Sequence, residues 1–279
     1  MKKGNDNLKF PLKGKYVIML APSFIVDFQY PSVILKLKEL GFDKVVELTF
    51  GAKMINREYH SVLEKSDKLL ISSVCPGIVE TIQGKFPEYK ENLIKVDSPM
   101  IAMAKICRKT YPKHKIVFLS PCNFKKSEAK QSGIIDYVID YRELKNLLEK
   151  INIKNNSRKV HFDKFYNDYT KIYPLAGGLS KTAHLKGVIK KKEVKIIDGI
   201  NEVSRFLKKP DRKIRFLDAN FCIGGCIGGP CINSKENIKK RKNRVSEYME
   251  SSKHEDIPDY KRGLVKKAEG IDFKLKTFK

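Results

Sequence analysis

Six cysteines are the residues of this 279-residue chain whose types and spacing could do chemistry. Three of them fall in the segment FCIGGCIGGPC (221–231), where C-x3-C and C-x4-C spacings enclose four glycines. Glycine lets a backbone approach a bulky ligand closely and leaves amides free to donate hydrogen bonds to sulfur. A buried apolar strand would not carry Gly-Gly twice. The segment therefore predicts thiolates that bind a metal centre.

Two further cysteines stand just after apolar runs that resemble strands. Cys75 follows the run 69–72 and precedes Pro76, a residue suited to the first turn of a helix. A thiolate at a helix N-terminus has a lowered pKa and suits a metal ligand. Cys122 follows the run 115–119, and sites in parallel sheets form beyond the carboxyl ends of strands. Taken alone, Cys75 and Cys122 are equally well explained as small buried side chains.

Four thiolates from three loops favour a cubane 4Fe–4S cluster. The expected ligands are Cys75, Cys122, Cys222 and Cys226. Zinc is the competing metal, but structural zinc sites usually use two tight C-x2-4-C pairs, and this chain has a single glycine-rich pair.

The remaining two cysteines have different explanations. Cys107 shares one face of a predicted helix (98–109) with Met100 and Met103, so we expect it in the core. Cys231 lies close enough to the glycine-rich pair to replace or supplement a ligand, and its role stays open.

The elements that must position these residues alternate between short apolar runs and amphipathic stretches. Strands are predicted at 15–21, 44–48, 69–72, 115–119, 136–139, 193–198 and 213–218. Helices are predicted at 31–41, 98–109, 141–150 and 199–210. This order predicts an α/β fold of two lobes with mainly parallel sheets, lobe one at 14–112 and lobe two at 113–218. A Cys/Gly loop and a charged helical tail (219–279) follow, and residues 151–171 carry no clear pattern.

Composition narrows the class of protein. The net charge is +25, but it coats the chain generally, so specific nucleic-acid binding is not expected. A general positive charge is better explained by electrostatic attraction of an acidic redox partner. No run approaches the roughly 20 apolar residues of a membrane span, and no apolar stretch follows the basic N-terminus. We expect a cytoplasmic protein with reduced cysteines.

Three motifs resemble those of a known family, the C-terminal domain of the FeFe (iron-only) hydrogenase large chain. The segments SSVCPGI (72–78), SPCNFKKSE (120–128) and NFCIGGCIGGP (220–230) stand in the order of that family's TSCCP-x-W, MPC-x-x-K-x-x-E and MAC-x-x-GC-x-x-GG motifs. The connecting segments 95–105, 138–149 and 175–186 are also similar. The resemblance covers nearly the whole chain, and three ordered motifs are more specific than any one of them.

The resemblance implies two α/β lobes that enclose an H-cluster, which joins a 4Fe–4S cubane to a two-iron subsite. By motif, the cubane ligands fall on Cys75, Cys122, Cys222 and Cys226, with Cys226 also bridging to the two-iron subsite. Lys125 matches a lysine that hydrogen-bonds a cyanide of the two-iron unit, and a cation there would balance an anionic cofactor. Glu128 matches a proton-pathway glutamate, and Ser98 matches a serine near the cofactor.

The chain departs from the family pattern at four positions. Val74 replaces the first cysteine of TSCCP, which passes protons to the two-iron site in the family, and valine cannot carry a proton. Ser120 and Asn220 replace methionines, and Ile78 replaces a tryptophan. No C-x2-C-x2-C run occurs, so electrons are expected from a ferredoxin or a separate electron-transfer subunit. A two-iron unit would also require dedicated maturation proteins.

Three functions remain at this point. The favoured one is a slow or hydrogen-sensing relative of the hydrogenases, a low-activity oxidoreductase with a cubane and possible H-cluster. The alternative is a cubane-only protein for electron transfer or iron–sulfur assembly. A nucleic-acid-binding module is supported by charge alone.

Overall fold

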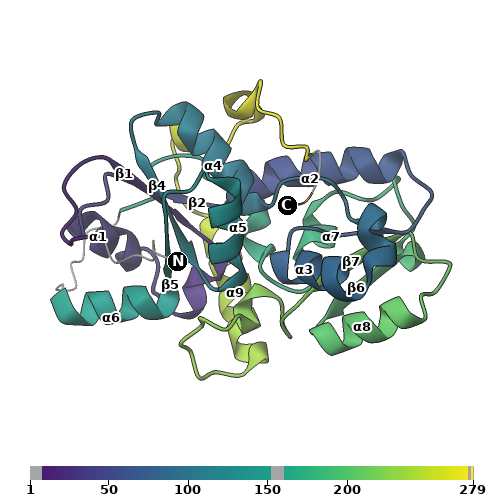
Figure 1. Ribbon diagram of the computed structural model, residues 1–279. Helices are drawn as coiled ribbons and strands as arrows, with labels where there is room; N and C mark the ends of the chain where they lie inside the picture. The colour runs from purple at the N-terminus through teal and green to yellow at the C-terminus, as the bar shows by residue number, and fades with distance from the viewer. Residues whose placement is uncertain (1–7, 152–159, 276–277, 279) are drawn as a thin grey trace.

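Two separate parallel sheets form the framework of the molecule. The computed structural model describes residues 8–151, 160–275 and 278. One sheet has four strands in the order β2-β1-β4-β5, and the other has three in the order β3-β7-β6. Figure 1 shows the two sheets at opposite ends of the molecule, with helices between and around them. The fold is therefore α/β with parallel sheets, as the sequence predicts.

The four-stranded sheet is built from apolar runs buried on both faces. Its centre pairs β1 (Tyr16–Leu20) with β4 (Lys115–Ser120), and its edges are β2 (Lys44–Glu47) and β5 (Tyr137–Asp140). Such runs are typical of parallel strands that are covered by helices on each side. Helices α1 (Ser32–Glu39) and α6 (Tyr141–Ile151) lie at this end of the molecule (Figure 1).

The three-stranded sheet is smaller and more exposed at one edge. Strand β7 (Phe216–Asn220) lies between β3 (Leu70–Ile71) and β6 (Val194–Asp198). Helices α3 (Pro76–Lys85) and α8 (Ile200–Lys208) contribute to its core. The buried residues that they share with the sheet include Ile71, Ile78, Ile82, Val203 and Leu217.

Five further helices complete the fold of the described residues. They are α2 (Thr49–Glu64), α4 (Pro99–Thr110), α5 (Phe124–Ser132), α7 (Gly178–Thr182) and α9 (Ile238–Ser252). Three of them, α2, α4 and α7, lie in the sequence between strands of different sheets. One hydrophobic core runs from Val17 in β1 to Phe216 in β7 through α2 and α4, so the two ends share a core. In the described part of the chain, no helix has the length and apolar character needed to cross a membrane.

The expected boundary between the lobes is wrong. Strand β3, expected in lobe one, pairs with β7, while β4 and β5, expected in lobe two, lie in the sheet of β1 and β2. Backbone bonds from Leu70 to Arg215 and from Ser72 to Leu217 join these distant segments. Parallel strands are joined by long crossovers, so neighbours in a sheet need not be neighbours in sequence. Each sheet therefore takes strands from both sides of residue 113.

The C-terminal tail is only partly helical. Helix α9 accounts for residues 238–252, and the described residues after it form short 3-10 turns at Asp259–Lys261 and Val265–Ala268. Other 3-10 turns occur at Pro22–Val26, Pro87–Asn92, Tyr169–Ile172, Lys191–Glu193 and Cys226–Gly228. Of the segment 151–171, residues 152–159 lie outside the described part of the chain.

Candidate iron–sulfur site

The four expected ligands stand in three loops that follow strands β3, β4 and β7. Cys75 is the N-cap residue of α3, with an extended backbone and Pro76 in the first turn. Its carbonyl accepts hydrogen bonds from the amides of Ile78 (3.0 Å) and Val79 (3.2 Å), and its thiol makes no capping bond. The fold therefore uses the Cys75 backbone to start a helix and leaves the sulfur for another partner.

The loop that carries Cys122 is shaped by Ser120, the last residue of β4. The Ser120 hydroxyl donates to the carbonyl of Cys122 at 2.9 Å and accepts from its amide at 3.1 Å. A hydroxyl that bonds the backbone two residues on is a common way to fix a tight turn. Ser120 thus has a structural role in this chain, at the position where the family motif has methionine.

The loop of Cys222 and Cys226 is attached to the second sheet and to the segment after Tyr173. The amide of Gly224 donates to the carboxylate of Asp198, at the end of β6. The amide of Cys226 donates to the carbonyl of Pro174 at 2.7 Å. Gly225 has φ +77°, and a Cβ there would lie 2.6 Å from the Pro174 oxygen, so only glycine fits this close approach.

One packing contact joins all three loops. The rings of Phe124 and Phe221 meet edge to face with centroids 4.8 Å apart. A Cβ on Gly77 would lie 2.9 Å from both rings, so the first turn of α3 packs directly on them. Gly77 follows Cys75, Phe124 follows Cys122, and Phe221 precedes Cys222. The three cysteine loops are therefore held against one another by apolar contact.

The electrostatics of the thiols also show that they lie together. Burial, with a smaller contribution from the neighbouring thiols of Cys75 and Cys122, raises the pKa of Cys222 to about 12. Burial likewise raises the pKa of Cys122 and of Cys226, with Cys75 again a neighbour of each. Part of Cys226 is exposed at the surface, and its thiol nevertheless interacts with those of the other three cysteines. Thiols this close ionise together only when positive charge compensates them.

The arrangement suits a cluster better than a single ion. Within the described residues, no three His, Cys, Asp or Glu side chains surround a point where one metal ion could bind. Zinc would need four ligands within about 2.3 Å of one centre. In a cubane each iron takes its own thiolate, so the four sulfurs spread around a larger body. The donor set and the glycine-rich approach fit a 4Fe–4S cluster.

Lys125 and Glu128 lie beside these thiols on α5. The Lys125 ammonium forms an ion pair with Glu128 at 2.6 Å and donates to the carbonyl of Val74 at 3.3 Å. The positive charge of Lys125 opposes part of the rise in the pKa of Cys226 that burial causes. Val74 is partly buried and packs against the main core.

Ser98 caps α4, and its hydroxyl accepts from the amide of Ile101 at 3.5 Å. It lies with Asp97 and Glu128 on a cavity of about 500 Å³. The buried carboxylate of Asp97 is paired with Lys105 at 2.6 Å, and burial raises the pKa of Asp97 to about 6. The structure thus brings Ser98 and Glu128 to one cavity, although the hydroxyl of Ser98 already has a capping role.

The other two cysteines lie in different environments. Cys107 is fully buried in the main core, as expected, and burial raises the pKa of its thiol. Cys231 is also buried, and its sulfur donates to the side chain of Asn123 at 3.2 Å. Its amide donates to the carbonyl of Pro121 at 3.1 Å. Cys231 therefore ties the glycine-rich loop to the Cys122 loop.

Two supporting residues were not found by sequence reasoning. Asp198 accepts a hydrogen bond from the amide of Gly224, and Pro174 accepts one from the amide of Cys226. The available sequence signal was the Gly-Gly pair at 177–178, which indicates close backbone packing next to Pro174. Gly177 has φ +74°, and Gly178 lies too close to the backbone of Ile172 and Tyr173 to carry a side chain.

Fold and site together define a class: an α/β protein of two parallel sheets with four thiols at the ends of three strands. The model of one family, the C-terminal domain of the iron only hydrogenase large subunit, matches residues 14–230. The chain belongs to this family. Its members are iron–sulfur proteins, and this chain is a hydrogenase-like iron–sulfur protein.

Two curated relatives support the assignment. Iron hydrogenase 1 of Clostridium pasteurianum is 26% identical over 280 residues, covering 78% of this chain and 49% of that protein. The NADP-reducing hydrogenase subunit HndD of Solidesulfovibrio fructosivorans is 26% identical over 255 residues, covering 69% of this chain and 44% of that protein. The chain thus spans about half the length of the curated relatives it matches.

Solved structures confirm the fold. A variant of the FeFe hydrogenase HydA1 from Chlamydomonas reinhardtii aligns over 94% of this chain and 88% of its own, with TM-score 0.63 and 14% identity. A structure that describes oxygen damage to the 2Fe subcluster of the H cluster aligns over 94% of this chain and 89% of its own, with TM-score 0.64 and 17% identity. A third concerns stepwise assembly of the H-cluster. The H-cluster is the cofactor of those two hydrogenases.

Proposed function

We propose that this chain is a slow or hydrogen-sensing form of the FeFe hydrogenases, with its cluster held by Cys75, Cys122, Cys222 and Cys226. The packing of Gly77, Phe124 and Phe221 supports this ligand set because it joins the three loops that carry the thiols. When bound, such a cluster supplies storage and transfer of electrons. The chain itself supplies thiolate ligands and a nearby cation.

The observation that carries the slow or sensory role is Val74. Its carbonyl accepts from Lys125, so the residue lies between the Cys75 loop and α5. Its side chain packs against apolar residues of the main core and has no exchangeable proton. General acid catalysis needs a donor within hydrogen-bond reach of the reacting group, directly or through one water. A valine here removes that donor and keeps the position dry.

The alternative, a cubane-only protein for electron transfer or cluster assembly, is favoured by one contact. The Lys125 ammonium is already paired with Glu128 at 2.6 Å, with both side chains largely buried. A lysine that must balance an anionic two-iron unit would have to share or give up this carboxylate. The ion pair therefore favours the alternative function, because it gives Lys125 a structural role on α5 that does not require a two-iron unit.

Infrared spectroscopy distinguishes the two functions. The protein would be purified after expression with the maturation proteins of the family, and a second sample would be made without them. Bands in the carbonyl and cyanide stretching region, present only in the first sample, support the slow or sensory hydrogenase. A brown iron–sulfur protein without these bands in either sample supports the cubane-only function.

We further propose that a ferredoxin or a separate electron-transfer subunit delivers electrons in the cytoplasm. The positive charge of the chain, +25 overall, would attract an acidic carrier and raise its rate of association. The relationship to a subunit of a NADP-reducing hydrogenase supports a separate redox partner. Specific nucleic-acid binding is not part of this proposal.

A further inference from the structure

A second cavity, away from the cysteine loops, has features that the cluster function does not use. It has a volume of about 720 Å³ and lies between α2, the segment 166–170, the end of α7 and the turn at 262–264. We propose that this cavity binds a nucleoside polyphosphate. The proposal goes beyond the iron–sulfur function and does not depend on it.

Cations dominate the wall of the cavity. Lys53, Arg57 and Arg262 line it together with two histidines, His60 and His184. Arg57 is exposed on α2 and has no carboxylate partner within the described part of the chain. Arg and Lys side chains on a concave surface suit the phosphates of a nucleotide.

A single carboxylate lines the same cavity, and it is already engaged. Asp168 accepts a hydrogen bond from the amide of Tyr169 at 2.7 Å. Lys53 donates to the carbonyl of Gly263 at 3.2 Å, which leaves its ammonium further protons to donate. The net charge of the wall therefore stays positive, which favours an anion.

A planar platform lies at one side of the cavity. The rings of Tyr169 and His184 stack with centroids 5.0 Å apart and an angle of 12° between their planes. Tyr169 remains 42% exposed, and its hydroxyl is fixed by a bond to the carbonyl of Lys181 at 2.9 Å. An exposed aromatic ring held in place is the kind of surface on which a nucleobase stacks.

One residue of the cavity wall contains a buried acceptor without a partner. Asn56 lines the cavity and is only 5% exposed. Its side-chain nitrogen donates to Thr182 at 2.9 Å, whereas its oxygen has no hydrogen-bond partner among the described residues. Such unpaired buried groups are rare in native proteins and suggest an absent partner. Asn56 therefore adds a polar residue to the wall of the cavity.

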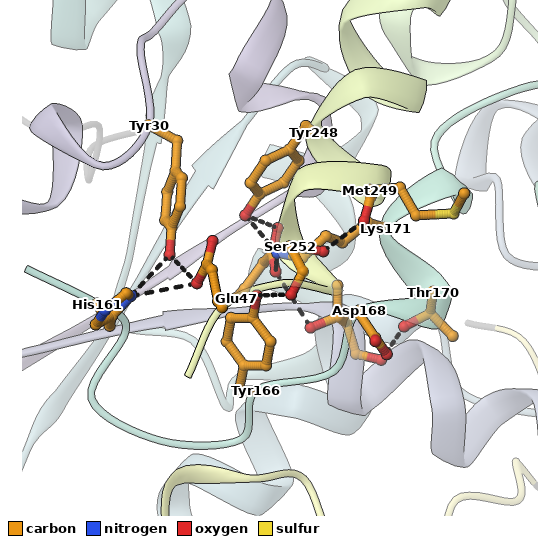
Figure 2. A network of polar contacts seen from close by, with 12 residues as sticks. Tyr30, Glu47, His161, Tyr166, Asp168, Thr170, Lys171, Tyr248, Met249 and Ser252 are labelled. Carbon is orange, nitrogen blue, oxygen red and sulfur yellow. Dashed lines mark hydrogen bonds and ion pairs between the residues drawn. The ribbon is translucent and has the colours of Figure 1, made fainter. Parts of the chain in front are cut away.

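The floor of the cavity is rigid. Tyr166, Asp168 and Thr170 line the cavity and also belong to the polar network in Figure 2. The Tyr166 hydroxyl donates to the carbonyl of Ser252 at 3.0 Å, and the Thr170 hydroxyl donates to that of Thr49 at 2.6 Å. A preformed floor reduces the ordering cost of binding, and the volume lies in the range of small-ligand sites.

Calorimetric titration tests the proposal with three probes at physiological salt. These are ATP, adenosine and inorganic tripolyphosphate, titrated into the whole purified chain. We expect ATP to bind at least about tenfold more tightly than either of its parts, since the base and the phosphates meet different walls. Equal binding of ATP and tripolyphosphate would overturn the proposal, because a diffuse basic surface does not recognise a base. Absence of ATP binding at millimolar concentration would also overturn it.

Two matched pairs of variants locate the site. Arg57→Glu should weaken ATP binding at least about tenfold, whereas Arg205→Glu, the same reversal on exposed α8, should change it less than about twofold. Tyr169→Ala should remove the preference for ATP over tripolyphosphate, and Tyr169→Phe should keep it. Equal effects of the two arginine variants would show adventitious binding to the basic coat. Thermal melting of each variant confirms that the chain is folded.

Discussion

Among single residues, the cysteines differ most clearly in what surrounds them. We expect that anaerobic reconstitution of the wild type yields about four irons and four sulfides per chain, as one cubane requires. Cys222→Ala and Cys226→Ala should lose most of the brown absorbance, because each removes a thiolate from the joined loops. Iron and sulfide analysis with visible absorbance measures this loss.

Cys107→Ala is the control for that series. Cys107 is fully buried in the core, so its substitution should reduce stability by about 1 kcal/mol and leave the iron content unchanged. Loss of the cluster in Cys107→Ala together with its retention in Cys75→Ala would show that the proposed ligand set is wrong.

Val74 is the residue at which hydrogen chemistry would be limited. In a matured protein with infrared bands from a two-iron unit, we expect hydrogen evolution at least about 10²-fold slower than in ordinary hydrogenases, because positioned proton transfer contributes about 10²–10⁴-fold in rate. Val74→Cys should raise the rate by restoring an exchangeable proton. The assay is hydrogen evolution from a reduced dye.

Val74→Ala is the matched control, since it opens space without adding a donor. A gain in Val74→Cys that Val74→Ala lacks supports proton delivery by the thiol. A wild type that already evolves hydrogen as fast as ordinary hydrogenases would refute the role given to Val74.

Asp97 makes the stability of the fold depend on pH. Burial raises its pKa from 3.8 to about 6 in the folded protein, against the opposing effect of Lys105. The folded state therefore holds this proton more tightly than the unfolded chain. The resulting stabilisation is complete below about pH 4 and is lost as pH rises to about 6.

We expect the difference in unfolding free energy, wild type minus Asp97→Asn, to fall by up to about 3 kcal/mol between pH 4 and pH 7. Urea denaturation at several pH values measures it. Glu250→Gln, an exposed substitution on α9, should give a curve parallel to that of the wild type. Parallel curves for Asp97→Asn as well would contradict the raised pKa.

Side-chain types and spacing were enough to propose which cysteines act together, and the structure brings those loops into contact. The residues that fix the loops could not be predicted in the same way. Asp198 and Pro174 act on Gly224 and Cys226 through backbone hydrogen bonds across long sequence separations. Nothing in their local pattern marks such a bond, because it depends on how distant elements pack.

At the level of elements, a buried ion pair joins the 3-10 turn Tyr169–Ile172 to β2, and α9 is attached to this pair through Tyr248. Lys171 and Glu47 form this pair at 2.8 Å, and both side chains are essentially inaccessible to solvent. The Tyr248 hydroxyl of α9 donates to Glu47 at 2.9 Å, and its ring lies 3.9 Å from the Lys171 nitrogen (Figure 2). Burial raises the pKa of Glu47 and lowers that of Lys171, so desolvation opposes both charges.

Lys171→Met should lower the free energy of unfolding by about 3–5 kcal/mol, because it leaves the Glu47 carboxylate buried without its cation. Urea denaturation measures the change. The double variant Lys171→Met, Glu47→Gln should cost less than the single variant, since no uncompensated charge remains. A single variant within about 1 kcal/mol of the wild type would mean that the pair contributes little.

Most helices and strands could be predicted from the local sequence pattern. The pairing of the strands into two sheets could not. All seven strands of the described residues occur where apolar runs predict them, because a buried strand must be apolar over a few consecutive residues. Which strands pair is decided by the crossovers. Strand β3 has only two residues, Leu70 and Ile71, and its short sequence does not reveal that its partner lies beyond residue 215.

Across the whole molecule, the charge of +25 predicts weak and unspecific attraction to polyanions. Binding to generic duplex DNA should be detectable at low salt and lost at physiological salt, since a diffuse basic coat is screened within about 8 Å. Fluorescence anisotropy across a salt series measures it. A complex that survives physiological salt and prefers one sequence would support a nucleic-acid function instead.

The interleaving of the two sheets has a consequence for the order of events during synthesis. Strands β1, β2, β4 and β5 leave the ribosome early and can pair while β7 is still to be made. Strand β3 lacks its strand partner until then, because it joins the second sheet by pairing with β7. Domains generally fold as units during translation, and unpaired strand edges in partly made chains invite aggregation. The loop of Cys75 therefore lacks the neighbours that hold it until the glycine-rich loop has been made, and cluster insertion has to follow the synthesis of both loops.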